Sequence, residues 1–243
     1  MSDWVQGIDV SRYQGAILQP QWEALYAAGQ RVAVVGSAHP SPNPHAEGNL
    51  ARAEAAGFIL ATYAVVWPGL PSGTTIQVAK QMCGRFWDNL SFVGIDCETD
   101  GITEAQIYGM EQAILAEGLR PIMYTGQWWW QGHFGDSQAF KHLPLWTANY
   151  RTPPNSDAVP LYGGWGREQL IGHQWAGTVS LAGVTVDRNN FLKEFVMPND
   201  AEVTRLRNLL TVTNLFLDAA EHAVAGTPLP AGLKAQLRWL LAG

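Results

Sequence analysis

The stretch of sequence that decides the fold is FVGIDCETDG, residues 92–101. Its first four residues are apolar or glycine and predict a buried strand, which ends abruptly in acidic residues. A strand interior accommodates charge only at a high cost in free energy, so these acids are expected at the rim of a core, where they can meet a substrate.

The two acids Asp96 and Glu98 are two residues apart on an extended chain, so their side chains point to the same face. Repulsion between two such carboxylates raises the pKa of the less solvated one. Hydrolysis of a glycosidic bond typically uses one protonated acid, which donates a proton, and one ionised acid beside it. We therefore expect Glu98 to hold a proton at neutral pH and Asp96 to stay ionised.

Two further segments repeat the pattern of a short apolar strand that runs into an acid. VQGIDVS, residues 5–11, contains Asp9, and VTVDRN, residues 184–189, contains Asp187. An Asp-x-Glu pair alone occurs often by chance. Three strands that each deliver a carboxylate at their carboxyl end predict a parallel barrel with its site on that face.

Composition sets the class of protein. The chain has 243 residues, 47% of them hydrophobic and 15% charged, with a formal net charge of −6. This length fits one barrel or two small domains. Lysine and arginine are not clustered, so no nucleic-acid partner is expected. The 11 tryptophans are many for this length; most are expected in the core, and exposed ones would suit flat sugar rings.

Neither a cofactor nor a metal site is expected. Cys83 and Cys97 are interpreted as reduced, buried structural residues. A calcium-loop pattern that begins at Asp96 has Ile107 where the bidentate carboxylate is required, and the six histidines lack zinc-site spacing.

The beginning of the sequence lacks the basic segment and apolar run of a signal peptide, and no stretch is long enough to span a bilayer. We expect synthesis in the cytoplasm and no membrane insertion.

Strand and helix signals alternate along the first half of the chain. Strands are expected at 5–10, 31–37, 58–66, 91–97 and 121–125, and helices at 20–29, before Gly57, at 74–87 and at 103–117. Three more strands, at 143–148, 170–175 and 179–186, follow with loops in place of clear helices. This predicts an α/β fold, an irregular TIM-like barrel with about five βα units followed by three strands.

Two domains are expected. Residues 1–197 form the barrel, and residues 198–243 show two helical patterns separated by a proline- and glycine-rich break, which predicts a C-terminal helical hairpin of unknown role. The hairpin could cover the barrel, form a homo-oligomer contact, or anchor the protein to a wall or particle.

Several short motifs occur in a fixed order. They are GIDVS (7–11), YQG (13–15), GIDCE (94–98), PIMYT (121–125), LWTANY (145–150), HQW (173–175) and VDRN (186–189). Together they resemble glycoside hydrolase family 25, the muramidase lysozymes found in bacteria, fungi and phage endolysins. The resemblance covers residues 5–192, and the family's irregular barrel agrees with the strand pattern.

The resemblance implies cleavage, with retention, of the β-1,4 bond between N-acetylmuramic acid and N-acetylglucosamine in bacterial peptidoglycan. It implies that Glu98 is the general acid, that Asp96 is the stabilising carboxylate, and that Asp9 and Asp187 complete the acidic cluster. Whether an Asp attacks the sugar directly or assists the substrate's N-acetyl group is left open.

The resemblance also places four residues near the sugar-binding groove: Tyr63, Tyr124, Trp146 and Gln174. The run Trp128-Trp129-Trp130 admits two interpretations. At least one of the three should be exposed; it could stack on a sugar, or the run could buttress the loop above the fifth strand.

A phage endolysin or other lytic factor, released to the wall by a separate pore or carried on a virion, is the preferred interpretation. A wall-binding or virion structural protein without turnover is one alternative, although all four acids are present. A glycosidase of another N-acetylated polymer, such as chitin, is the other.

Overall fold

The computed structural model describes residues 3–151 and 154–197. The predicted helical hairpin at 198–243 lies outside the described residues. The account below therefore concerns the barrel.

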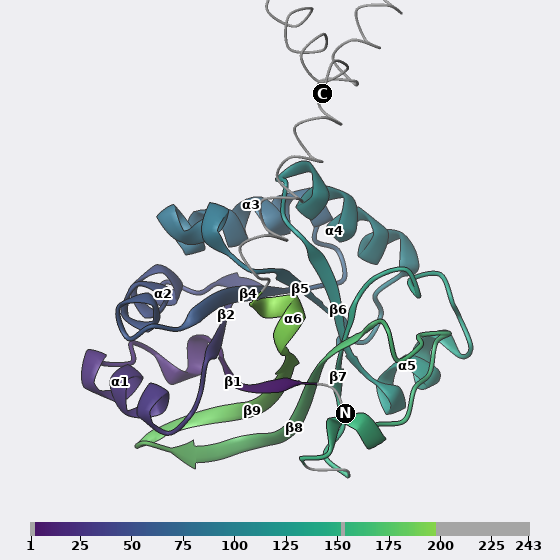
Figure 1. Ribbon diagram of the computed structural model, residues 1–243. Helices are drawn as coiled ribbons and strands as arrows, with labels where there is room; N and C mark the ends of the chain where they lie inside the picture. The colour runs from purple at the N-terminus through teal and green to yellow at the C-terminus, as the bar shows by residue number, and fades with distance from the viewer. Residues whose placement is uncertain (1–2, 152–153, 198–243) are drawn as a thin grey trace, which may run out of the picture. The chain divides into compact units, whose positions relative to one another are not determined.

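Nine strands of the described chain form a single sheet that closes on itself (Figure 1). They are β1 (Trp4–Val10), β2 (Val32–His39), β3 (Ser41–Pro42), β4 (Ile59–Val65), β5 (Val93–Asp96), β6 (Pro121–Gly126), β7 (Leu145–Ala148), β8 (Leu170–Leu181) and β9 (Val184–Leu192). The order is β1-β9-β8-β7-β6-β5-β4-β2-β3, and a β1–β2 pairing closes the ring. The short β3 pairs only with β2, so eight strands make the barrel wall.

Helices follow the first five wall strands. They are α1 (Gln19–Ala27), α2 (Ala46–Ala55), α3 (Ser72–Cys83), α4 (Glu104–Ala116) and α5 (Gln127–Phe134), with a short α6 (Lys193–Val196) after β9. The predicted architecture of five βα units followed by three strands is confirmed. In the part of the chain that the structure describes, no helix is both long and apolar enough to cross a membrane.

Helix α5 completes the fifth βα unit, and its bounds are not evident from the sequence. Its sequence, QWWWQGHF, is rich in residues of modest helix propensity and contains a glycine. The helix forms because Trp129 and Trp130 are buried on one side of it. Tertiary packing here overrides a weak local preference.

The last two strands also differ from expectation. The predicted strand at 179–186 is divided by a hairpin turn at Ala182 and Gly183, both at positive φ, as tight hairpin turns require. Strand β9 is antiparallel to both β8 and β1, so the barrel is mixed and not wholly parallel. Asp187 consequently lies within an antiparallel strand and not at the carboxyl end of a parallel one.

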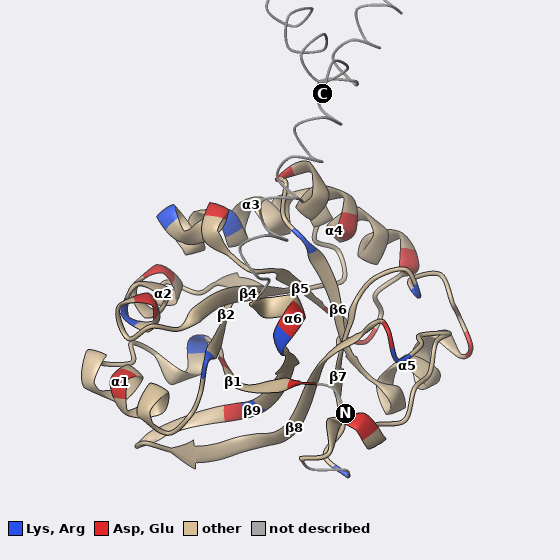
Figure 2. Ribbon diagram, viewed as in Figure 1, with Lys and Arg blue, Asp and Glu red and all other residues tan. Residues whose placement is uncertain are grey.

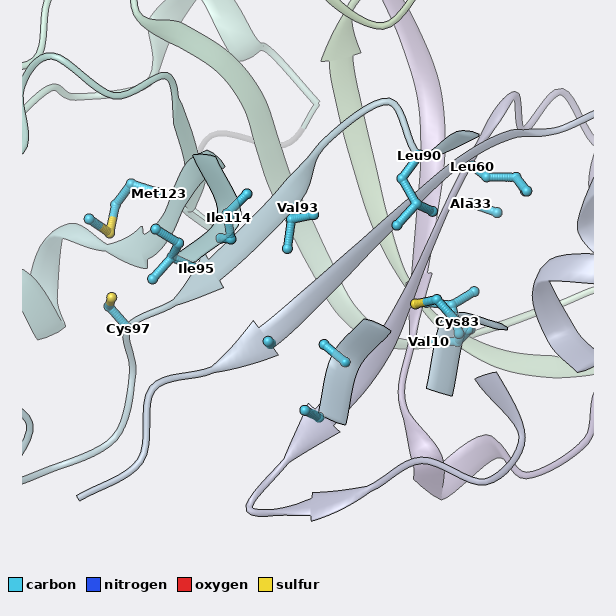
Figure 3. Packing of buried hydrophobic residues seen from close by; sticks show 14 of the residues in the cluster. Val10, Ala33, Leu60, Cys83, Leu90, Val93, Ile95, Cys97, Ile114 and Met123 are labelled. Carbon is cyan, nitrogen blue, oxygen red and sulfur yellow. The ribbon is translucent and has the colours of Figure 1, made fainter. Parts of the chain in front are cut away.

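Alternate residues of each wall strand enter one of two hydrophobic layers. Outward-facing residues pack against the helices, as Val93, Ile95 and Cys97 do along β5 and beyond it (Figure 3). Both cysteines are free and buried in this layer, so their structural interpretation is confirmed.

The inward-facing layer is rich in aromatic rings: Tyr63, Phe92, Tyr124, Trp146 and Phe191. At the amino-terminal end of β5, Phe92 contacts Phe195 of α6, with 6.2 Å between ring centroids. These contacts fill the barrel below the strand ends that carry the acids.

Glycines on inward-facing positions make room for two of these rings. A Cβ on Gly36 would lie 2.4 Å from the Tyr63 ring, and a Cβ on Gly172 would lie 2.7 Å from the Trp146 indole. Only glycine allows such close approach of a ring to a neighbouring strand. The glycines thus fix where Tyr63 and Trp146 lie beneath the site.

Candidate active site

A pocket of about 220 Å³ opens at the end of the barrel where β1, β5 and β6 terminate. Its lining includes all eight residues singled out from the sequence: Asp9, Tyr63, Asp96, Glu98, Tyr124, Trp146, Gln174 and Asp187. We call it the acid pocket. The structure therefore brings the predicted site residues together, and their individual roles remain predictions.

The four acids come from three strands. Asp9 is near the end of β1 and pairs across the sheet with Asp187 of β9. Asp96 ends β5, and Glu98 follows two residues later, so both side chains enter the pocket while Cys97 between them faces the outer layer. Most other charged residues lie on the helices and loops around the barrel (Figure 2).

Asp9 is buried but well supplied with hydrogen-bond donors. Its Oδ2 accepts from Asn189 Nδ2 at 2.7 Å and from Gln174 Nε2 at 2.9 Å. Burial, aided by the charge of Asp187, raises the pKa of Asp9 to about 7 against the opposing effect of these two donors. Asp9 is held in one orientation and titrates near neutrality.

Glu98 is the acid best placed to hold a proton for donation. Its Oε1 is buried and has no hydrogen-bond partner among the described residues. Burial, with a contribution from the charge of Asp187, raises the pKa of Glu98 to about 7, and the nearby Tyr124 hydroxyl opposes the shift. A carboxyl group with this pKa is partly protonated at neutral pH, as a general acid must be.

Asp96 corrects an expectation from the sequence. Burial, together with the charges of Glu98 and Asp9, raises the pKa of Asp96 well above its usual range, and only the backbone N–H of Glu98 opposes this. These effects favour the protonated form of Asp96, whereas the sequence predicts that Asp96 stays ionised. Asp96 is only partly exposed at the rim of the acid pocket, so the surrounding protein and the neighbouring acids both disfavour its charged form.

Asp187 is less enclosed than Asp9. Burial raises the pKa of Asp187, and a hydrogen bond that the Thr178 backbone N–H donates to its Oδ1 at 2.6 Å opposes the shift. Asp9 thus has two side-chain donors that favour its ionised form, whereas one donor favours the ionised form of each of the other three acids. The four groups interact and titrate as a set.

A hydrogen-bond network sets the positions of the acids. Tyr124 donates its hydroxyl proton to Gln174 Oε1 at 2.9 Å, and Gln174 in turn donates to Asp9. The Trp146 indole donates to Asn189 Oδ1 at 2.9 Å, which orients the Asn189 amide toward Asp9.

Two members of this network were missed as site residues. Asn189 lies two residues after Asp187 on the same strand, so period-two alternation places both on one face and could have identified it. Tyr150, whose hydroxyl also donates to Gln174 Oε1, ends the LWTANY motif beyond β7, and no local pattern directs its side chain.

Clustered acids with perturbed pKa values, set among aromatic and amide side chains at the mouth of an α/β barrel, define a class of enzyme. They are the features of a glycoside hydrolase, in which one carboxyl group donates a proton and another carries negative charge.

Comparison with known proteins identifies the family. The model of the family described as "Glycosyl hydrolases family 25" matches residues 8–184. The chain belongs to this family and is a glycoside hydrolase, which confirms the resemblance found in the sequence.

Two characterised relatives have modest sequence identity. The N,O-diacetylmuramidase of Chalaropsis sp. is 27% identical over 184 residues, which cover 66% of this chain and 83% of that protein. Lysozyme M1 of Streptomyces globisporus is 26% identical over 210 residues, 77% of this chain and 67% of that protein.

Solved structures share the fold. A muramidase from Acremonium alcalophilum gives a TM-score of 0.62 at 19% identity, covering 80% of this chain and all (100%) of that one. A bacterial lysozyme from Streptomyces coelicolor gives a TM-score of 0.59 at 23% identity, covering 79% of this chain and 96% of that one. At this level of identity the likeness concerns the barrel architecture alone.

Proposed function

We propose that this enzyme hydrolyses bacterial peptidoglycan at the β-1,4 bond between N-acetylmuramic acid and N-acetylglucosamine, with retention. The observation that carries the proposal is Glu98, a buried carboxyl group with an unpartnered oxygen and a pKa raised to about 7. It lies in one pocket with three further acids. The characterised relatives, named as a muramidase and a lysozyme, support the choice of substrate.

Glu98 acts as the general acid in this proposal. Its proton passes to the glycosidic oxygen as the bond from that oxygen to the sugar's anomeric carbon breaks, and the leaving sugar departs as an alcohol. Glu98 is then a carboxylate and removes a proton from the incoming water in the second step. Retention follows because each step inverts the anomeric carbon once.

Asp96 supplies negative charge to the positively charged sugar. The form of the site that turns over has a proton on Glu98 and none on Asp96. A positive charge that develops beside Asp96 lowers its pKa, which reverses the effect of burial in the empty pocket. This holds whether Asp96 attacks the anomeric carbon or orients the substrate's N-acetyl group.

The remaining predicted residues position these groups and the sugar. The charge of Asp187 raises the pKa of Glu98 and so helps to hold its proton in place, and Asp9 is oriented beside it by Asn189 and Gln174. The rings of Tyr63, Tyr124 and Trp146 form the floor on which a sugar would rest, with Gln174 as a hydrogen-bonding group.

The test compares wild type with Glu98→Gln on purified peptidoglycan and on chitin. Loss of turbidity and new muramic-acid reducing ends, identified by mass spectrometry and absent with the variant, would support the proposal. Cleavage of chitin alone would favour a glycosidase of another N-acetylated polymer. Binding of folded wild type without release of products would favour a non-catalytic wall-binding protein.

We further propose that the enzyme acts at the bacterial cell wall. Purified protein added to bacteria with exposed walls should clear the suspension, and intact cells with an outer membrane should resist it. A phage origin and a homo-oligomer through residues 198–243 stay predictions from the sequence.

A further inference from the structure

A second pocket at the mouth of the barrel has no role in the proposed chemistry. Its volume is about 440 Å³, and we call it the Trp128 pocket. It is lined by Gln127, Trp128, Gln131, Ala148, Asn149, Tyr150 and Arg151. Its lining comes from α5, which follows β6, and from the carboxyl end of β7 with the three residues after it; Figure 1 shows these elements. Strands β5, β6 and β7 are parallel neighbours, so the pocket lies on the same face of the barrel as the acids.

Trp128 is exposed, and its position is defined. Its side chain is 65% exposed, whereas Trp129 and Trp130 are buried. A Cβ on Gly126 would lie 2.5 Å from the Trp128 indole nitrogen, so the ring rests against the backbone at the end of β6. The two interpretations of the tryptophan run therefore apply to different residues. Trp129 and Trp130 pack in the core and support the segment that follows β6, whereas Trp128 lines a pocket.

Tyr150 connects the Trp128 pocket to the acid pocket. It lines the former, and its hydroxyl donates to Oε1 of Gln174, which lines the latter. Gln174 Oε1 also accepts from Tyr124. Tyr150 is therefore the residue through which the linings of the two pockets are in contact.

The two pockets have opposite charge. Four acids and no Lys or Arg line the acid pocket, and Arg151 is the one charged residue lining the Trp128 pocket, as far as the structure describes the chain. A third pocket of about 480 Å³, which shares Tyr13 and Gln14 with the acid pocket, has no charged residue in its described lining. An anionic part of a ligand would be repelled by the acids and attracted by Arg151.

Muramic acid carries such an anionic part. Its lactyl ether ends in a carboxyl group, which is free in bare glycan and is joined in the wall to a peptide that has carboxyl groups of its own. We propose that the Trp128 pocket binds the carboxylate-bearing substituent of a muramyl residue. Arg151 pairs with the carboxylate, and the rings of Trp128 and Tyr150 cover the apolar atoms beside it. This inference rests on the proposed function.

The test uses the variants Arg151→Gln and Arg151→Lys on three soluble substrates. These are glycan strands with their peptides, strands freed of peptide, and peptide-free strands whose carboxyl groups are methyl esters. We expect Arg151→Gln to lower kcat/KM about tenfold on a carboxylate substrate, mainly through KM, and to leave the ester unaffected. Arg151→Lys should retain part of the wild-type value because it keeps the charge.

The matched control for charge is Lys141→Gln, which removes one exposed cation outside all three pockets. It should leave kcat/KM on every substrate at the wild-type value. If Arg151→Gln loses kcat/KM only on the strands that carry peptides, the ligand is a peptide carboxylate. If Arg151→Gln also loses kcat/KM on peptide-free strands with free carboxyl groups, the ligand is the lactyl carboxylate.

The aromatic part is tested by Trp128→Ala and by Gly126→Ala, whose added Cβ displaces the indole without changing a ring. Both should raise KM on peptidoglycan severalfold. The control is Tyr108→Ala on α4, which removes a ring that is 55% exposed and lines none of the three pockets. Circular dichroism establishes that each variant is folded.

The outcomes separate this inference from the proposed function. If Arg151→Gln changes kcat/KM equally on all three substrates, or changes it on none of them, the Trp128 pocket does not bind a carboxylate. If wild type fails to cleave untreated strands, the proposed function itself is wrong.

Discussion

Replacing Glu98 by Gln should abolish activity and stabilise the fold, and the two effects have one cause. The amide matches the carboxyl group in size but cannot donate the catalytic proton. General acid catalysis contributes about 10²–10⁴-fold in rate, so we expect residual activity of about 1% or less. The pKa of about 7 means that near pH 6 about nine tenths of wild-type molecules carry the proton on Glu98.

The stability change follows from the same pKa. Glu98 has an ordinary value of 4.5 when unfolded and about 7 when folded, so the folded state binds more protons between these values. The contribution of Glu98 to wild-type stability is therefore fully present below its unfolded-state pKa of 4.5, and it is lost as the pH rises through its folded-state pKa of about 7. The difference corresponds to about 3 kcal/mol at pH 8. Glu98→Gln avoids this cost and should be more stable than wild type by about that amount.

Urea unfolding of both proteins at pH 4 and pH 8 measures this effect, and glycan-strand hydrolysis measures activity. Glu54→Gln, an exposed position on α2, is the matched control and should change neither quantity. A gain in unfolding free energy that is equal at the two pH values, or a variant with more than a tenth of wild-type activity, would refute the reasoning.

Three further outcomes are expected. Wild-type kcat/KM should fall above about pH 7 as Glu98 loses its proton, and a pH profile that stays flat to pH 9 would contradict this. Asn189→Ala removes a donor to Asp9 and so raises its pKa, which a shift of the acidic limb of that profile to higher pH would reveal. Gly36→Ala forces the Tyr63 ring to move and should lower the free energy of unfolding by about 1–3 kcal/mol in urea.

Most of the fold was predictable because each wall strand is a short apolar run with its own boundaries. The runs before Asp9 and around Asp96 are examples. The turn between β8 and β9 was not predicted from the sequence. The residues on both sides of it favour strands, and Ala182 is not a residue type expected at positive φ. The bounds of helix α5 were not predictable because this helix depends on burial of Trp129 and Trp130, which no local pattern specifies.

The sequence predicted that eight residues would share one pocket, and it did not predict the pKa shifts of the acids or the contributions of Asn189 and Tyr150. Alternation along a strand placed Asp96 and Glu98 together, and the repeated pattern of an apolar strand that runs into an acid added Asp9 and Asp187. The ionisation of Asp96 depends on how completely neighbouring elements exclude water, which is a property of the assembled barrel. The same holds for Tyr150, which reaches Gln174 only through the fold.

The antiparallel strand β9 has a consequence for the order in which the enzyme gains its activity. Asp9 lies near the start of the sequence, and its pairing partner Asp187 and its donor Asn189 are made almost 180 residues later. A chain whose synthesis has not reached β9 lacks Asp187 and Asn189, so it cannot complete the acid pocket. Barrel closure and catalytic competence therefore coincide, so the nascent polypeptide remains inert until β9 has emerged from the ribosome and paired with β1.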